Sequence, residues 1–357
     1  MGYEVRELRA EDLDEITRVI DLCDDDDSSP ARRDLQDYLR EGGLCRAQGN
    51  FVALAGGRPV GIVGYAVDRF DEPGVDVYWG TWFYVHPEHH GRGVGRVLYL
   101  HTIEALRRLG CRKLYANVSS DPVYDAARRF YARAGFVLEH AHPDYFGPGE
   151  HSEIYAVRLD PHRRPAPPED CPPAPPAVLQ ARDPVRVREA RPTYRPALVE
   201  LFRPYGAMQA VRADAYVWRH FARPEPSHRL YVAASRRAGL VGVAALEPAE
   251  EEEVDTEVFW VPLLGTHPAY REAAVPVLLG HIEARQRRRG GRRLYASLPG
   301  VPAFAELAAE LERAGFEREG ALPDYYADGI ERVFFCKALS EPPPAAPQPA
   351  AGADPSS

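Results

Sequence analysis

Apolar and polar positions along the first half of the chain predict helices and strands in alternation. Apolar residues recur at helical spacing from Leu13 to Ile20, which predicts a helix over 12–22, and a second helix is expected over 32–40. Strands are expected at 51–55 and 60–67, joined by the glycine turn at 56–57, because short apolar runs flank a turn signal. The remaining pattern predicts strands at 3–9, 75–85, 113–118, 136–141 and 152–159, and helices at 93–109 and 122–134. This order predicts a mixed α/β fold with a partly antiparallel sheet.

The second half of the chain repeats the first at an offset of about 180 residues. The segment RAGF at 133–136 recurs at 313–316, and PDYF at 143–146 recurs as PDYY at 323–326. RKLYA ending at Ala116 likewise matches RRLYA ending at Ala296. Matches that keep both order and spacing indicate a tandem duplication of one domain.

Proline marks the expected boundaries of the two copies. Proline-rich stretches occupy 161–184 and the region after Ser340, and such sequences cannot sustain helix or sheet hydrogen bonding. We therefore expect a first domain at 1–160, a linker at 161–184, a second domain at 185–340 and a disordered tail at 341–357.

Composition and charge exclude several classes of partner. The 357 residues carry 44 Lys and Arg against 53 Asp and Glu, a net charge of −9, which disfavours nucleic acid and mildly favours cationic small molecules. The arginine run at 285–293 is interpreted as the cationic end of a helix. There is no apolar stretch of about 18 residues and no signal peptide at the start, so no membrane contact and a cytoplasmic location are expected. The five cysteines lack the spacing of a metal site, and neither the His89-His90 pair nor the aspartate run at 24–27 forms a metal-binding pattern. We therefore expect no metal site.

The most informative stretch is HPEHHGRGVGR at 86–96, between an expected strand and a long expected helix. Glycines at 91, 93 and 95 allow the backbone to approach an anion, and the free N–H groups of a helix start favour a pyrophosphate. Arg92 and Arg96 add positive charge. Taken alone, this spacing also fits a simple tight turn.

These residues resemble the acyl-CoA loop of the GNAT acyltransferase superfamily, [Q/R]-x-x-G-x-[G/A] after a strand ending in V-x-P. Val85 and Pro87 end the strand, His90 stands at the Gln/Arg position, and Gly93 and Gly95 fill the two small positions. Downstream, ARRFYARAGF at 127–136 is similar to the family pattern A-x-x-x-Y-x-x-x-G-F. The resemblance implies two tandem GNAT-like N-acyltransferase domains. Two departures stand out, since Tyr124 replaces a usual Asn and there is no carboxylate near Gly80 and Thr81.

The resemblance also implies a site and a co-substrate. Acetyl-CoA would bind along the end of the long strand and the glycine loop, at Phe83, Tyr84, Val85, His90, Gly91, Arg92, Gly93, Val94, Gly95 and Arg96. Tyr131 would be the general acid, because a phenol with a pKa near 10 stays protonated at neutral pH and can protonate a thiolate. For the general base we select Asp76, while His142, Asp144 and water relayed to solvent remain alternatives. Aromatic residues of the same strand could line the acceptor pocket: Trp79, Trp82, Phe83 and Tyr84.

The second copy has lost these features. Glu272 and Pro276 stand opposite the glycine loop. Glu272 places a negative charge where a pyrophosphate would be expected, and Pro276 lacks a backbone N–H. Leu311 stands opposite Tyr131. We therefore expect an N-acetyltransferase with one active site in the first domain. The alternative is a catalytically silent acyl-CoA sensor or ligand-binding module. The acceptor, a small amine or a peptide N-terminus, the acyl preference and the oligomeric state are left open.

Overall fold

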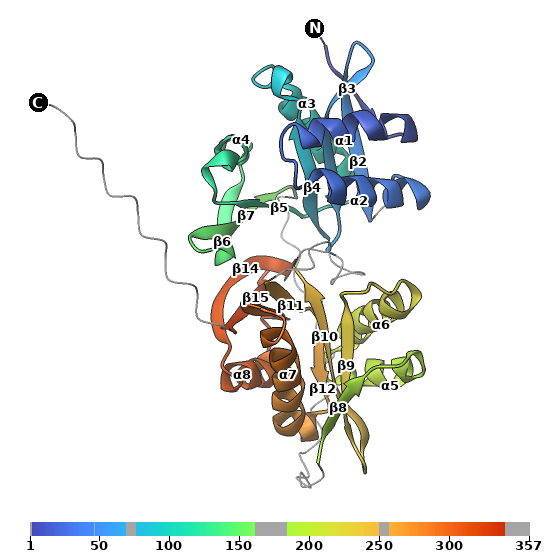
Figure 1. Ribbon diagram of the computed structural model, residues 1–357, viewed down its shortest axis with the longest axis vertical. Helices are drawn as coiled ribbons and strands as arrows, with labels where there is room; N and C mark the ends of the chain where they lie inside the picture. The colour runs from blue at the N-terminus through green and yellow to red at the C-terminus, as the bar shows by residue number, and fades with distance from the viewer. Residues whose placement is uncertain (1, 46, 69–75, 161–183, 250–256, 340–357) are drawn as a thin grey trace, which may run out of the picture.

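The computed structural model describes residues 2–45, 47–68, 76–160, 184–249 and 257–339 (Figure 1). Two sheets lie within them, one in an N-terminal unit ending with Arg158 and one in a C-terminal unit beginning at Arg186. The mixed α/β fold expected from the sequence is present, and each unit contains one of the two mixed sheets. The predicted tail, and the predicted linker except for residue 184, lie outside the described residues.

The N-terminal unit has seven strands in the order β1-β2-β3-β4-β5-β7-β6. Only β4 and β5 are parallel, and every other neighbouring pair is antiparallel. The strands are β1 (Glu4–Glu7), β2 (Gln48–Ala55), β3 (Arg58–Ala66), β4 (Val77–Val85), β5 (Lys113–Ser119), β6 (Val137–Gly147) and β7 (Glu150–Arg158), and the helices are α1 (Leu13–Asp21), α2 (Ser28–Arg40), α3 (Val94–Arg108) and α4 (Asp125–Arg133).

Helices cover both faces of this sheet, which explains the unbroken apolar run of β2. Phe51 and Ala53 pack with α3 and α4, whereas Val52 and Leu54 pack with α1 and α2 on the opposite face. The turn from β2 to β3 uses Gly56 and Gly57, both at positive φ, as a tight hairpin with two left-handed residues requires.

The C-terminal unit repeats this plan with strands in the order β14-β15-β13-β11-β10-β9-β8, and β12 pairs with β10. Its strands are β8 (Arg186–Glu189), β9 (Arg229–Ser235), β10 (Gly239–Pro248), β11 (Val258–Val261), β12 (Leu264–Thr266), β13 (Arg293–Pro299), β14 (Glu317–Ala327) and β15 (Ile330–Ala338), and its helices are α5 (Arg195–Glu200), α6 (Ala207–Ala222), α7 (Arg271–Arg287) and α8 (Ala305–Arg313).

The two units meet through β6 and β14, which lie side by side (Figure 1). The contact is nearly two-fold symmetric. The buried Arg112 binds Asp76 and donates to the backbone oxygens of Asp324 and Tyr325. In the other direction, Arg292 binds Glu257 and donates to the backbone oxygens of Asp144 and Tyr145. The repeated PDYF and PDYY segments are therefore the hairpins through which the units hold each other.

Candidate active site

A cavity opens where the two parallel strands of the N-terminal sheet separate. Strands β4 and β5 pair only from Val77 to Trp79, although β4 continues to Val85. Within β4 the register against β3 shifts, and Trp82 has a positive φ of 45°, which marks a bulge. The residues of both strands beyond their pairing line one cavity of about 560 Å³. This volume suits a small molecule or the reactive end of a larger one.

Side chains from two helices close the cavity. Tyr99 and Thr102 come from α3, and Phe130 and Tyr131 come from α4. Three of the four aromatic residues predicted for an acceptor pocket also line it, namely Trp82, Phe83 and Tyr84. Trp79 lies elsewhere, because its ring stacks on Tyr115 and its indole N–H donates to the Tyr325 hydroxyl across the interface between the units.

The glycine loop lies between the end of β4 and the start of α3. Gly91 and Gly93 have positive φ values of 71° and 87°, and no atom lies within 4 Å of the place where a Cβ would be. Helix α3 begins directly after Gly93, so the free N–H groups of its first turn lie beside exposed backbone. The His90 ring bonds the Val85 carbonyl oxygen at 2.7 Å, which ties the loop to the strand. The geometry is that of an anion-binding helix start, with Arg92 and Arg96 exposed beside it.

Tyr131 lines the cavity and is largely buried. Its ring packs against Phe136 and Tyr155. Burial raises the pKa of the Tyr131 hydroxyl to about 12. Within the described part of the chain this hydroxyl has no hydrogen-bond partner. It is therefore a protonated donor at neutral pH that can serve a bound molecule.

The residues considered as bases from the sequence lie away from the cavity. Asp76 accepts a hydrogen bond from Arg112 Nε at 2.9 Å, where the two units meet. Asp144 has a positive φ of 49°, and its carboxylate caps the hairpin by accepting from the N–H of Gly149 at 2.7 Å. His142 is buried against Glu319 of the other unit. The geometry assigns all three residues to the contact between the units.

Two aspartates that the sequence interpretation left in a solvated loop line the cavity instead. Tyr84 donates a hydrogen bond to Asp27, and Tyr124 donates one to Asp24. Burial raises the pKa of Asp27, and the hydrogen bond from Tyr84 partly opposes this rise. Further carboxylates on the lining are Asp26, Asp34 and Glu150. The sequence signal for this arrangement was Tyr124, which occupies the position of the expected Asn and reaches the aspartate loop.

The equivalent region of the C-terminal unit is closed. Helix α7 already begins at Arg271, the residue opposite His90, so a helical turn replaces the glycine loop. Arg271 is buried and pairs with Glu306. Leu311, opposite Tyr131, is fully buried in the core. The corresponding cavity, lined by residues 262–264 after β11 and by residues 297–299 of β13, measures only about 50 Å³.

Comparison with known proteins places part of the chain in a family. Residues 11–136 match the model of the acetyltransferase (GNAT) family. No curated protein sequence matches the chain. No helix in the described ranges is long and apolar enough to cross a membrane.

Solved structures that align with part of the chain include a GNAT-family protein from Desulfovibrio desulfuricans, at 23% identity and a TM-score of 0.42, which aligns over 44% of this chain and 100% of its own. The ribosomal-protein-S18-alanine N-acetyltransferase from Escherichia coli aligns at 18% identity over 46% of this chain and 99% of its own, with a TM-score of 0.37. The aminoglycoside 6'-N-acetyltransferase from Enterococcus faecium aligns at 13% identity over the same shares, with a TM-score of 0.37. By its family model, the chain carries a domain of the GNAT acetyltransferase family over residues 11–136.

Proposed function

We propose that the protein is an N-acetyltransferase that transfers the acetyl group of acetyl-CoA to an amine on a cationic acceptor, with its one active site in the N-terminal unit. The observation that carries this proposal is the continuity of the site. The glycine loop joins β4 to α3, and both of these elements also line the cavity that contains Tyr131 and Asp27.

The loop fits the pyrophosphate of acetyl-CoA. Gly91 and Gly93 leave room for phosphate oxygens, the first turn of α3 offers N–H donors, and Arg92 and Arg96 supply positive charge. The edge of β4 beyond Trp79 is not paired with β5, so backbone groups near Phe83 and Val85 can bind the pantetheine arm. Acetyl-CoA supplies a thioester carbonyl that an amine attacks directly.

The carboxylates around the cavity select and prepare the acceptor. An acceptor amine arrives protonated, so it must be held by negative charge and must lose a proton before it attacks. Asp27, fixed by Tyr84, holds the ammonium and accepts this proton. Asp24, fixed by Tyr124, lies on the same lining and attracts a second positive charge of the acceptor.

Tyr131 completes the reaction at the leaving group. After the amine nitrogen bonds to the acetyl carbon, the nitrogen releases its second proton to solvent, the carbon–sulfur bond breaks and the sulfur leaves as a thiolate. The Tyr131 hydroxyl donates its proton to this sulfur, which the raised pKa allows because the phenol is protonated beforehand. Solvent then returns a proton to Tyr131.

Release of free CoA thiol from acetyl-CoA tests this function. The acceptor panel contains a monoamine, a diamine, a polyamine, an amino sugar with several amines and a peptide with a free N-terminus, and longer acyl donors are tested with the best acceptor. We expect acceptor-dependent thiol release, with higher kcat/KM for acceptors that carry two or more positive charges. If the chain binds acetyl-CoA but releases no thiol with any acceptor, it is a ligand-binding module and not an enzyme.

A further inference from the structure

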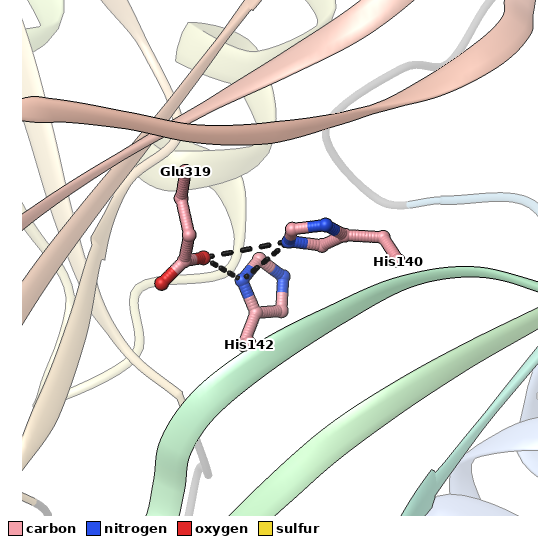
Figure 2. Close-up of side chains that lie close together, drawn as sticks. All are labelled: His140, His142 and Glu319. Carbon is pink, nitrogen blue, oxygen red and sulfur yellow. Dashed lines mark hydrogen bonds and ion pairs between the residues drawn. The ribbon is translucent and has the colours of Figure 1, made fainter.

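Three metal-ligating side chains converge where the two units meet, outside the cavity described above. His140 and His142 lie two residues apart on β6, which places both on one face, and Glu319 comes from β14 of the other unit. Figure 2 shows the two imidazoles and the carboxylate turned toward one another. His140 Nε2 lies 3.2 Å from His142 Nδ1 and 3.4 Å from Glu319 Oε2, and His142 Nδ1 lies 2.5 Å from Glu319 Oε2.

Hydrogen bonds from the two rings to Glu319 account for two sides of this triangle but not for the contact between the ring nitrogens. Each ring nitrogen carries at most one proton when the imidazole is neutral. If the N–H groups of both rings donate to the same Glu319 oxygen, His140 Nε2 and His142 Nδ1 both carry a proton. They then lie 3.2 Å apart, and neither nitrogen can accept a hydrogen bond from the other. Three donor atoms directed at one point are instead the usual arrangement around a cation.

The cluster is enclosed and shaped by its surroundings. The side chain of His142 is 3% exposed, that of His140 7% and that of Glu319 12%. Phe334 stacks on the His140 ring with centroids 5.0 Å apart. A Cβ at Gly320 would lie 2.5 Å from the same ring, so glycine at this position makes room for the histidine. The rings of Tyr145, Trp260 and Tyr295 surround His142.

Glu319 lacks the lysine partner that its symmetry-related counterpart in the N-terminal unit has. The counterpart of Glu319 in the N-terminal unit is Glu139, and Lys113 Nζ neutralises it at 2.6 Å. The residue equivalent to Lys113 is Arg293, which pairs with Asp144 instead. Among the described residues, neither lysine nor arginine forms an ion pair with Glu319. A buried carboxylate without such a partner is costly unless another cation compensates it.

We propose that His140, His142 and Glu319 bind one divalent transition-metal ion of the zinc type, which joins the two units. Bonds of about 2.1 Å from zinc to nitrogen and oxygen place neighbouring ligand atoms roughly 3.0–3.4 Å apart. Two of the three distances already have these values, and the pair of His142 and Glu319 would open by less than about 1 Å. Two imidazoles and one carboxylate form a donor set that zinc prefers, and the fourth position is left for water.

Titration of the full-length chain with Zn²⁺ after removal of metals by a chelator tests the site. We expect one zinc per chain by calorimetry and elemental analysis, and a higher Tm with zinc than with the chelator. Glu319→Gln and His142→Gln should each weaken zinc binding by more than about 100-fold, since loss of a direct ligand exceeds the usual effect of its supporting residues. Glu139→Gln, the symmetry-related control, should bind zinc as the unaltered chain does.

Three results would overturn this proposal. One is zinc binding that persists in both Glu319→Gln and His142→Gln but disappears in His89→Gln, because the zinc would then bind the histidines of the glycine loop. Another is an unaltered chain that binds no zinc and has the same Tm with and without the chelator, which would leave a hydrogen-bonded cluster only. The last result needs no variant. It is that the unaltered chain, loaded with Co²⁺, shows no cobalt absorption band that disappears when zinc is added.

Discussion

At the scale of single residues, the proposed chemistry depends on two groups whose protonation is set by burial. Tyr131 is enclosed by Phe130, Phe136 and Tyr155, and burial raises the pKa of its hydroxyl to about 12. Burial also raises the pKa of Asp27. Both shifts have the same physical cause, since a low-dielectric environment penalises the charged form. One group therefore stays a donor at neutral pH, and the other becomes a stronger base than an exposed aspartate.

Replacing Tyr131 with Phe should lower kcat by about 100-fold or more, with little change in the Kd for acetyl-CoA. A proton donor to the leaving group acts only in the transition state, so its loss affects turnover and not binding. Steady-state kinetics and calorimetry measure the two quantities. Tyr155→Phe is the matched control, because Tyr155 contacts the Tyr131 ring and donates to Glu153 outside the cavity lining. Full turnover in Tyr131→Phe would remove this residue from the mechanism.

The pH dependence of kcat/KM should carry the signature of Asp27. A base works in its ionised form, so activity falls as the pH decreases through the pKa of its carboxyl. Because burial raises the pKa of Asp27, this fall should begin at a higher pH than an exposed aspartate would give. Tyr84→Phe removes a hydrogen bond that lowers the pKa of Asp27, so it should move the acidic limb to still higher pH. Asp27→Asn should remove the acidic limb of the pH profile together with most of the activity. Asp25→Asn, which changes an exposed residue, should preserve both. A limb that stays in place in Tyr84→Phe would argue against Asp27 as the base.

At the scale of elements, a single helical turn distinguishes the two halves of the chain. Helix α3 begins at Val94 after the glycine loop, while α7 begins four residues earlier in the equivalent register, at Arg271. Because α7 starts earlier, the N–H groups that a phosphate would need lie inside the helix and bond to carbonyl groups of the preceding turn. Small changes at a helix start can therefore remove an anion site without changing the fold.

Placing a charge in the loop should separate cofactor binding from folding. Gly93→Glu should weaken acetyl-CoA binding by at least about 30-fold, or on the order of 2 kcal/mol, because a carboxylate would oppose the pyrophosphate at the helix start. Gly110→Glu is the control: Gly110 also has positive φ, 76°, and open space around it, but lies after the C-terminal end of α3. Calorimetric titration of both variants should find normal binding only in Gly110→Glu. Equal binding by the two would mean that the loop is not the pyrophosphate site.

Local sequence pattern was sufficient to predict most elements but not the pairing of distant side chains. The helix predicted over 93–109 is α3, and the strand predicted over 75–85 is β4, because periodicity and flanking glycine or proline act within a few residues. The aspartates at 24 and 27 depend on Tyr124 and Tyr84, which lie 100 and 57 residues away. No local pattern encodes such a contact, so these carboxylates were interpreted as a solvated loop.

At the scale of the whole molecule, the duplicated chain holds itself together as a two-fold dimer would. Each unit inserts one buried arginine, Arg112 or Arg292, into the hairpin of the other. Trp79 and Trp260 repeat the same pattern toward Tyr325 and Tyr145. The repeated PDY segment could be recognised as a motif in the sequence, but its role could not, since its partners lie in the other copy.

Arg112→Ala should lower the free energy of unfolding by about 3 kcal/mol, because it leaves Asp76 and two carbonyl oxygens without their buried partner. Urea unfolding followed by tryptophan fluorescence measures this loss. Arg108→Ala is the control, since Arg108 pairs with Glu104 on an exposed helix surface, where such pairs contribute at most about 0.5 kcal/mol. Similar stabilities of the two variants would show that the arginine contact does not hold the units together.

The central claim is that one copy of the duplicated fold works and the other supports it. Calorimetric titration of the full chain with CoA tests this most directly, because both copies share a fold and differ at the loop, at residue 131 or 311, and in the size of the cavity. We expect one CoA per chain, and binding weakened by at least about 30-fold in Gly93→Glu. A stoichiometry of two, or binding that survives Gly93→Glu and is lost when Glu272 and Pro276 are replaced, would contradict the claim.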